Sequence, residues 1–118
     1  MRHVGLKRTV TPAALIIRLA GEIDYTSADE AASRLAQAAV ILPPPQVVIV
    51  DLTRVSHLSA AGLRVVQCFA VSCADRTVRA CFAIPPGSIV RRVIGLLPLD
   101  PRLAVFDSVD QALRAEAE

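Results

Sequence analysis

Apolar residues occur along this chain in two patterns, short continuous runs and stripes with helical spacing. The runs predict strands over residues 14–19, 46–50, 78–83 and 103–105. Residues 4–10, where polar and apolar residues are mixed, predict a first strand that pairs with the second as an antiparallel edge. The stripes begin after residues suited to helix N-caps and predict four amphipathic helices. The candidate caps are Thr26 or Ser27 for the first helix, and Ser59, Ser88 and Ser108 for the others. Apolar strands that alternate with helices are typical of a largely parallel sheet. The order β-β-α-β-α-β-α-β-α therefore predicts one α/β domain, with about five strands in a mixed, mostly parallel sheet and about four helices.

Two local expectations follow from the same patterns. The third strand is expected to end at Asp51, whose carboxylate then binds backbone N–H groups of a tight loop that contains His57. The helix after Ser88 is expected to turn its apolar residues toward the core, namely Ile89, Val90, Val93, Ile94 and Leu97.

Length and composition narrow the class of protein. The chain has 118 residues, the size of one ordinary domain, so we expect a single domain over residues 1–118. A hydrophobic fraction of 53% with 20% charged residues argues against disorder. The net charge of +2 is small and the basic residues are scattered, which argues against a nucleic-acid partner.

Nothing in the sequence predicts export or a membrane span. The residues after Met1 lack a continuous apolar segment, and Pro43 to Pro45 interrupt the longest uncharged stretch, residues 35–50. We therefore expect a cytoplasmic protein. Its three cysteines have no zinc-site spacing and are interpreted as small buried hydrophobes, with a redox role as the alternative: Cys68, Cys73 and Cys81.

Catalytic chemistry has little support in the sequence. The five glycines are isolated, so no phosphate-binding loop is predicted, and the only histidines are His3 and His57. We expect no enzyme activity, no cofactor and no metal. Asp24 and residues 59–62, however, follow parallel strands, and the carboxyl ends of such strands are where α/β folds bind ligands and partners. These residues are expected to converge on one surface.

Three segments resemble the signature of the STAS domain of bacterial anti-sigma-factor antagonists. The first is Gly21-Glu22-Ile23-Asp24, after an apolar strand. The second is Asp51-Leu52-Thr53, followed after a hydrophobic stretch by Ser59-Ala60-Ala61-Gly62-Leu63. The third runs over residues 82–117 and includes Leu99-Asp100 and Ala112-Leu113. The resemblance is strongest over residues 9–115 and implies a STAS-like fold.

The resemblance also implies a function and a changed switch. Such antagonists act in partner-switching control of transcription and dock an anti-sigma factor of the serine-kinase type. The resemblance implies that the docking surface of this chain consists of Asp24, Ser59, Ala60, Ala61, Gly62 and Leu63. The serine that the kinase phosphorylates corresponds to Ala61, which has no hydroxyl group. Ser59 is interpreted as a helix cap, with a displaced phosphorylation site as the alternative. Substitution of Gly62 by valine is expected to act mainly on binding.

Other roles stay open at this point. One is a STAS scaffold or accessory subunit of a signalling assembly or of a lipid ABC transporter. Another is a sensor of a small ligand such as a nucleotide or a lipid. A homodimer is compatible with each of these roles, and the sequence names neither the anti-sigma factor nor the sigma factor.

Overall fold

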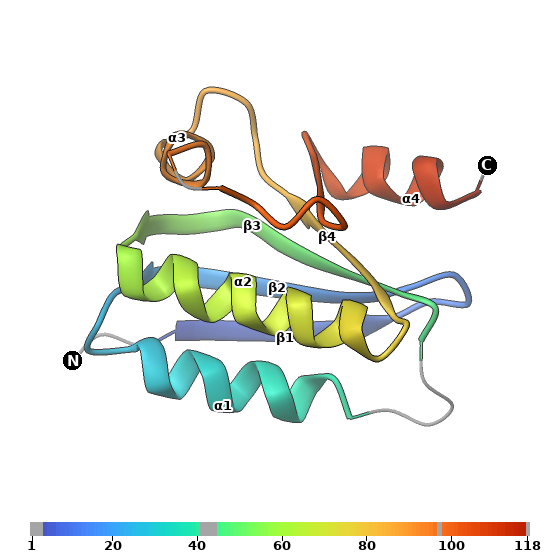
Figure 1. The fold of residues 1–118 in the computed structure, drawn as a ribbon, viewed down its shortest axis with the longest axis horizontal. Helices are drawn as coiled ribbons and strands as arrows, with labels where there is room; N and C mark the ends of the chain where they lie inside the picture. The colour runs from blue at the N-terminus through green and yellow to red at the C-terminus, as the bar shows by residue number, and fades with distance from the viewer. Residues whose placement is uncertain (1–3, 41–44, 97, 118) are drawn as a thin grey trace.

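A five-stranded sheet with helices on both faces forms the domain (Figure 1). The computed structural model describes residues 4–40, 45–96 and 98–117. The strands follow one another across the sheet in sequence order: β1 (Val4–Val10), β2 (Leu15–Ile23), β3 (Val47–Leu58), β4 (Arg79–Ala83) and β5 (Ala104–Phe106). β1 runs antiparallel to β2, and every other neighbouring pair is parallel. The predicted α/β class and mostly parallel sheet are confirmed, as is the antiparallel first strand.

Four helices cover the sheet in the described part of the chain: α1 (Ala28–Ala38), α2 (Ala60–Asp75), α3 (Ile89–Ile94) and α4 (Val109–Ala117). Parallel strands added one after another with right-handed crossovers place the connecting helices on one face. α1, α2 and α3 accordingly share a single core with that face, which we call the inner face. α4 follows the last strand and packs on the opposite, outer face through Ala112, beside Val109 and Leu113.

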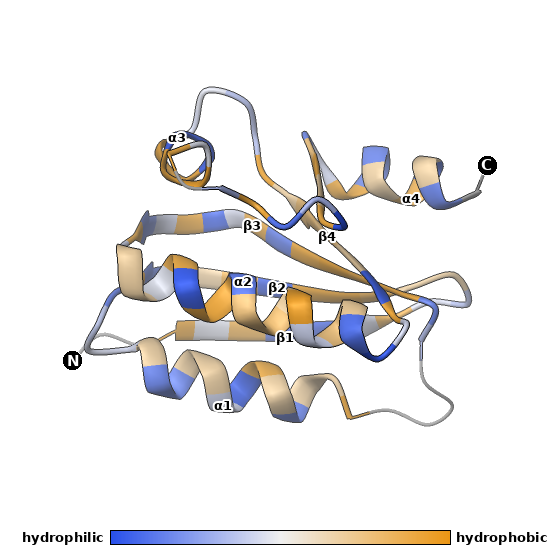
Figure 2. Ribbon diagram, viewed as in Figure 1, coloured by the Kyte–Doolittle hydropathy of each residue, from blue (hydrophilic) through white to orange (hydrophobic). Residues whose placement is uncertain are grey.

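The inner core is built from aliphatic side chains of the central strands. Leu15, Ile17 and Leu19 of β2 are fully buried there, and Phe82 of β4 is the largest buried side chain. The hydropathy colouring follows this arrangement in part, with apolar residues along much of the middle strands and polar residues between weakly apolar ones on α1 (Figure 2). Near β4, helices cover both faces of the sheet. Side chains on both sides of these strands are therefore apolar, which gives continuous apolar runs in the sequence.

β3 differs from the prediction, because it does not end at Asp51 but continues to Leu58. Its pairing with β2 shifts register twice, between Arg18 and Ala20 and between Gly21 and Glu22, so β3 carries two extra residues there. Such bulges change which face each following side chain occupies. The buried residues of β3 are consequently spaced by three beyond Leu52, at Val55 and Leu58. The prediction of a tight loop that contains His57 is therefore wrong, because His57 belongs to β3.

The first bulge explains the Asp51-Leu52-Thr53 motif. Asp51 is buried, and its Oδ1 accepts hydrogen bonds from the Thr53 backbone N–H at 2.9 Å and from Thr53 Oγ1 at 2.5 Å. Its Oδ2 accepts a 2.8 Å hydrogen bond from Arg18 Nε on the neighbouring strand. The carboxylate thus satisfies backbone that the irregular ladder leaves unpaired. The structural role expected for Asp51 is confirmed, within the strand instead of at its end.

The helix starts agree with the predicted caps in three of four cases. Ser59, Ser88 and Ser108 each accept a hydrogen bond from a backbone N–H three residues later. At α1, Ser27 holds the N-cap position but makes no capping hydrogen bond with its side chain. Ile89 of α3 is 63% exposed instead of turned inward, because its side chain lies at the first position of a six-residue helix. Leu97 lies outside the described residues.

Candidate functional site

The beginning of α2 lies directly against the end of β2. The Ser59 backbone N–H donates a 3.0 Å hydrogen bond to the Ile23 carbonyl, and Ser59 Oγ accepts one from the Gly62 N–H at 3.2 Å. Gly62 sits so close to β2 that a Cβ atom on it would lie 2.3 Å from the Ile23 carbonyl oxygen. The absence of a side chain at residue 62 is what allows this approach. The start of α2 is therefore fixed on the carboxyl end of β2.

The turn after β2 is held by Asp24. Its Oδ1 accepts hydrogen bonds from the backbone N–H groups of Thr26 at 2.9 Å and Ser27 at 3.1 Å, and from Thr26 Oγ1 at 2.6 Å. Ser27 Oγ in turn donates to the Glu22 carbonyl at 3.0 Å and accepts from the Asp24 N–H at 3.0 Å. Both Asp24 and Ser27 are buried. Asp24 thus orders the backbone that leads into α1 and has little surface of its own.

The turn after β2 and the start of α2 together form a surface with few side chains. We call residues 24–27 and 59–61 together the α2 entrance. Within it Tyr25 is 81% exposed, Ala60 is exposed, and Ser59 and Ala61 are partly exposed. Gly62 and Leu63 are buried beneath it, and Leu63 belongs to the inner core. The predicted site residues are therefore brought together, but only Ser59, Ala60 and Ala61 expose appreciable side-chain surface among them.

Sequence reasoning missed Tyr25, which is the only tyrosine of the chain. A large exposed aromatic side chain is a typical anchor at protein interfaces, because it buries much area at little conformational cost. Its position two residues after Ile23, just beyond the end of a strand, is the sequence feature that could have indicated an exposed aromatic residue at this site. No aromatic residue belongs to the motif that directed attention to residues 59–63.

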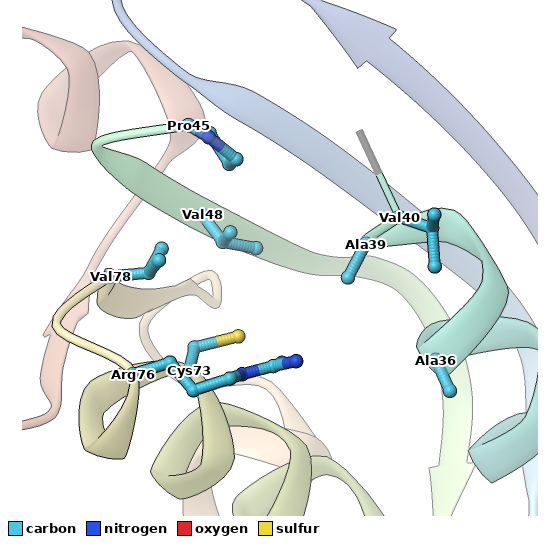
Figure 3. Close-up of a pocket in the computed structure, with 8 residues that line it drawn as sticks. All are labelled: Ala36, Ala39, Val40, Pro45, Val48, Cys73, Arg76 and Val78. Atoms are coloured by element: carbon cyan, nitrogen blue, oxygen red, sulfur yellow. The ribbon is translucent and has the colours of Figure 1, made fainter. Parts of the chain in front are cut away.

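An apolar cleft lies at the far end of α1 and α2 from the entrance (Figure 3). Its volume is about 310 Å³, and it is lined by Ala36, Ala39, Val40, Pro45, Val48, Cys73, Arg76 and Val78.

Burial raises the pKa of the Cys73 thiol, although Arg76 opposes the shift. Burial likewise raises the pKa of Cys81, to about 12. Both thiols are therefore protonated at neutral pH, which disfavours nucleophilic or redox chemistry at these two residues. The prediction of buried cysteines is correct for Cys73 and Cys81 but wrong for Cys68, which lies exposed on α2.

Metal-binding side chains do not converge at the α2 entrance. Across the described residues, no three His, Cys, Asp or Glu side chains come together as a metal site would require. No helix in the described part of the chain is long and apolar enough to cross a membrane. The α2 entrance thus combines a hydrogen-bonded backbone with small side chains and one exposed tyrosine.

Comparison with known proteins establishes the family. The STAS domain family matches residues 6–112, so the chain belongs to the STAS family. An anti-sigma factor antagonist from Mycobacterium paratuberculosis has a similar structure, with a TM-score of 0.83 and 19% identity, over 98% of this chain and 96% of that one. A putative anti-sigma factor antagonist from Thermotoga maritima has a TM-score of 0.81 and 14% identity, over 96% and 95% of the two chains.

A third similar structure comes from a different kind of protein. A sulfate transporter family protein from Wolinella succinogenes is 25% identical, with a TM-score of 0.66, over 92% of this chain and 88% of that one. A search of curated protein sequences found no match to the chain. The predicted STAS fold is confirmed, and both anti-sigma factor antagonists and a transporter-related protein share it.

Proposed function

We propose that this protein is a non-enzymatic anti-sigma-factor antagonist, which acts in the cytoplasm and docks an anti-sigma factor through the α2 entrance. The observation that carries the proposal is the make-up of the α2 entrance: Tyr25, 81% exposed, lies in the turn that Asp24 holds, and the small residues Ala60 and Ala61 follow Ser59, whose N–H donates a hydrogen bond to the end of β2. The structural likeness to anti-sigma factor antagonists supports this function.

Docking of this kind depends on close approach. Alanine at residues 60 and 61 lets a partner reach the first turn of α2, while Tyr25 in the turn after β2 supplies apolar area and a hydroxyl group for a hydrogen bond. The free N–H groups of the first helical turn also attract acidic groups of a partner. Binding costs the backbone little conformational entropy, because hydrogen bonds already order the turn after β2 and the start of α2.

Regulation by phosphate is proposed to be absent at residue 61. Ala61 offers no acceptor oxygen, and Ser59 Oγ already accepts the Gly62 N–H as a cap. The partner is proposed to be a serine-kinase-type anti-sigma factor, which this antagonist binds without being switched off. Control would then rest on the amount of the antagonist present. Phosphate on a closely packed interface would otherwise oppose docking through charge repulsion and desolvation.

Substitution of Ala61 by aspartate tests the docking surface. Ala61→Asp would bury an unpaired carboxylate against the partner and is expected to reduce affinity at least about a hundredfold. The melting temperature should stay nearly unchanged, because an acid in the first helical turn suits the helix dipole. Binding is measured by surface plasmon resonance against each purified serine-kinase-type anti-sigma factor of the same organism.

Ala13→Asp is the matched control, since Ala13 is an exposed alanine in the β1–β2 turn, at the other end of the sheet. It should bind like the wild type. Undiminished binding by Ala61→Asp, or no binding of any such anti-sigma factor by the wild type, would contradict the proposal. Tyr25→Ala should weaken binding as well, because it removes the exposed aromatic contact.

Ala61→Ser tests the missing switch. This variant should bind nearly as well as the wild type and should gain one phosphate when incubated with ATP and the kinase, as seen by intact-mass analysis. The wild type should gain none at residue 61. Stoichiometric phosphate mapped to Ser59 or Ser56 of the wild type would overturn the switchless interpretation.

A second candidate function is an accessory domain for a membrane transport system. The likeness to the sulfate transporter family protein at 25% identity favours this alternative. Binding of the purified protein to a transport subunit encoded beside it, combined with no binding to any anti-sigma factor, would select this role.

A further inference from the structure

Three basic side chains surround a hollow on the outer face of the sheet. The hollow has a volume of about 330 Å³ and is lined by Gly5, Leu6, Lys7, Arg18, Ala20 and Arg54. α4 covers only the part of this face formed by Ala14, Ile16, Val47, Ile49, Cys81 and Ala83. The hollow lies on the opposite face of the sheet from α2, so it is separate from the α2 entrance.

Strand register brings the three cations together. Lys7 of β1 lies directly opposite Arg18 of β2 in the antiparallel ladder, and Arg18 pairs in register with Asp51 of β3. In the next row, Gly5 lies opposite Ala20, which pairs in register with Arg54. Residues directly opposite each other have Cβ atoms about 5 Å apart. The small residues Gly5 and Ala20 therefore form a floor between the longer basic side chains.

The first bulge of β3 is what puts Arg54 in this group. Asp51 and Arg54 are three residues apart, and in a regular strand their side chains would point to opposite faces. The extra residue at the bulge brings the side chains of Asp51 and Arg54 to the same, outer face of the sheet. Leu52 and Val55 then both face the inner core. The bulge is stabilised by the Asp51 carboxylate. One local irregularity thus both buries the core residues and places a cation.

Charge in the hollow is only partly balanced. The Asp51 carboxylate pairs with Arg18 at 2.8 Å, and the Arg18 side chain is 40% exposed. Among the residues that the structure describes, no ion pair or hydrogen bond of the Lys7 or Arg54 side chain is found. Like charges directly opposite in a ladder, such as Lys7 and Arg18, are unfavourable for the sheet. An anion in the hollow would relieve that repulsion while meeting up to three cationic donors.

We propose that this hollow binds the phosphate group of a ligand with two or more negative charges. An ammonium and two guanidinium groups supply charge-assisted hydrogen bonds, and guanidinium groups match phosphate oxygens in pairs. The open floor at Gly5 and Ala20 leaves room for the phosphate to approach the sheet. A small phosphorylated compound and an anionic lipid headgroup share this chemistry, and the same cations would recognise either.

The test uses inorganic pyrophosphate as the probe and isothermal titration calorimetry on the full chain. The wild type should bind it saturably, and more weakly as potassium chloride is added. The Lys7→Gln/Arg54→Gln double variant should lose at least about tenfold in affinity. Its melting temperature should not fall, because both side chains are exposed and one of them opposes Arg18.

Arg92→Gln/Arg114→Gln is the matched control, since it removes two exposed arginines on α3 and α4 with the same change in net charge. It should bind within about twofold of the wild type. No saturable binding by the wild type, or an equal loss in the control, would overturn the proposal.

A vesicle arm identifies the source of the phosphate. Sedimentation with phosphatidylcholine vesicles that contain phosphatidic acid should capture the wild type, and not the double variant, if the ligand is a lipid headgroup. Binding of pyrophosphate without such capture assigns a small soluble ligand.

Discussion

Gly62 and Ile23 are in contact across the junction of α2 and β2, and the contact leaves no room for a side chain. A methyl group on residue 62 would lie 2.3 Å from the Ile23 carbonyl oxygen and 2.9 Å from Ile23 Cγ2. The neighbour is backbone on one side, so it cannot rotate away. The sequence suggested that bulk at residue 62 acts mainly on binding, whereas this geometry makes Gly62 a residue on which the fold depends.

We therefore expect Gly62→Ala to lower the free energy of unfolding by about 2–4 kcal/mol, because α2 must move away from β2. Urea unfolding followed by circular dichroism measures this. Gly95→Ala is the control: its added Cβ would lie 3.5 Å from the nearest carbonyl oxygens, an ordinary contact, and its φ of −72° suits alanine. Equal stability of the Gly62→Ala protein and the wild type would contradict the prediction.

The Asp51 carboxylate should matter more to stability than the arginine that pairs with it. Asp51→Ala removes a buried carboxylate and leaves its two part-buried hydrogen bonds to Thr53 unmade, and it should cost about 2–4 kcal/mol of unfolding free energy. Arg18→Gln removes a partner that is 40% exposed and should cost less than about 1 kcal/mol. Chemical denaturation of both variants gives the comparison. A larger cost for Arg18→Gln would mean that the ion pair, and not the bulge, dominates.

Thr77 ends α2 with a backbone conformation that suits glycine. Its φ is 64°, a left-handed value that β-branched residues rarely adopt. The N–H groups of Thr77 and Val78 donate to the Ala74 and Cys73 carbonyls, as at a helix C-terminus of this type. Thr77→Gly should therefore raise the free energy of unfolding by about 1 kcal/mol. Thr77→Ala, which keeps a Cβ atom, should gain less in the same urea titration, and an unchanged midpoint for Thr77→Gly would show no strain.

Cys81 should make the fold sensitive to alkaline pH. Burial raises the pKa of its thiol from 9.0 to about 12, so the unfolded chain loses this proton at lower pH than the folded one. The contribution is fully present below about pH 9 and is lost as pH rises toward about pH 12. Unfolding free energies at about pH 7 and about pH 10 should therefore differ less in Cys81→Ala than in the wild type. An identical difference in both proteins would sink this assignment.

The sequence predicted the class of fold because its strands are apolar on both faces and its helices begin at serine caps. Pattern alone failed at β3, where the buried residues Leu52, Val55 and Leu58 are spaced by three. That spacing matches neither a regular strand nor a helix, because each bulge adds a residue that no period anticipates. A loop was therefore predicted where the strand continues.

The grouping of the candidate site residues in space was predictable for a different reason. Residues 24 and 59–61 follow parallel strands, and topology alone brings such ends together. Which of them reach the surface depends on packing that sequence does not encode locally, such as the approach of Gly62 to Ile23. The grouping of Lys7, Arg18 and Arg54 likewise requires the register of three strands, which only the structure supplies.

The sequential order of the strands has a consequence for how the chain folds. Every strand pairs with the one made immediately before it, so no strand has to be inserted between two that already pair. Each addition closes only one crossover loop, and the entropy of loop closure is met in small steps. During synthesis the β1–β2 hairpin can form first, and the sheet can then extend strand by strand as the chain emerges. β5, a strand of three residues, joins after β4, and α4 can then pack on the outer face.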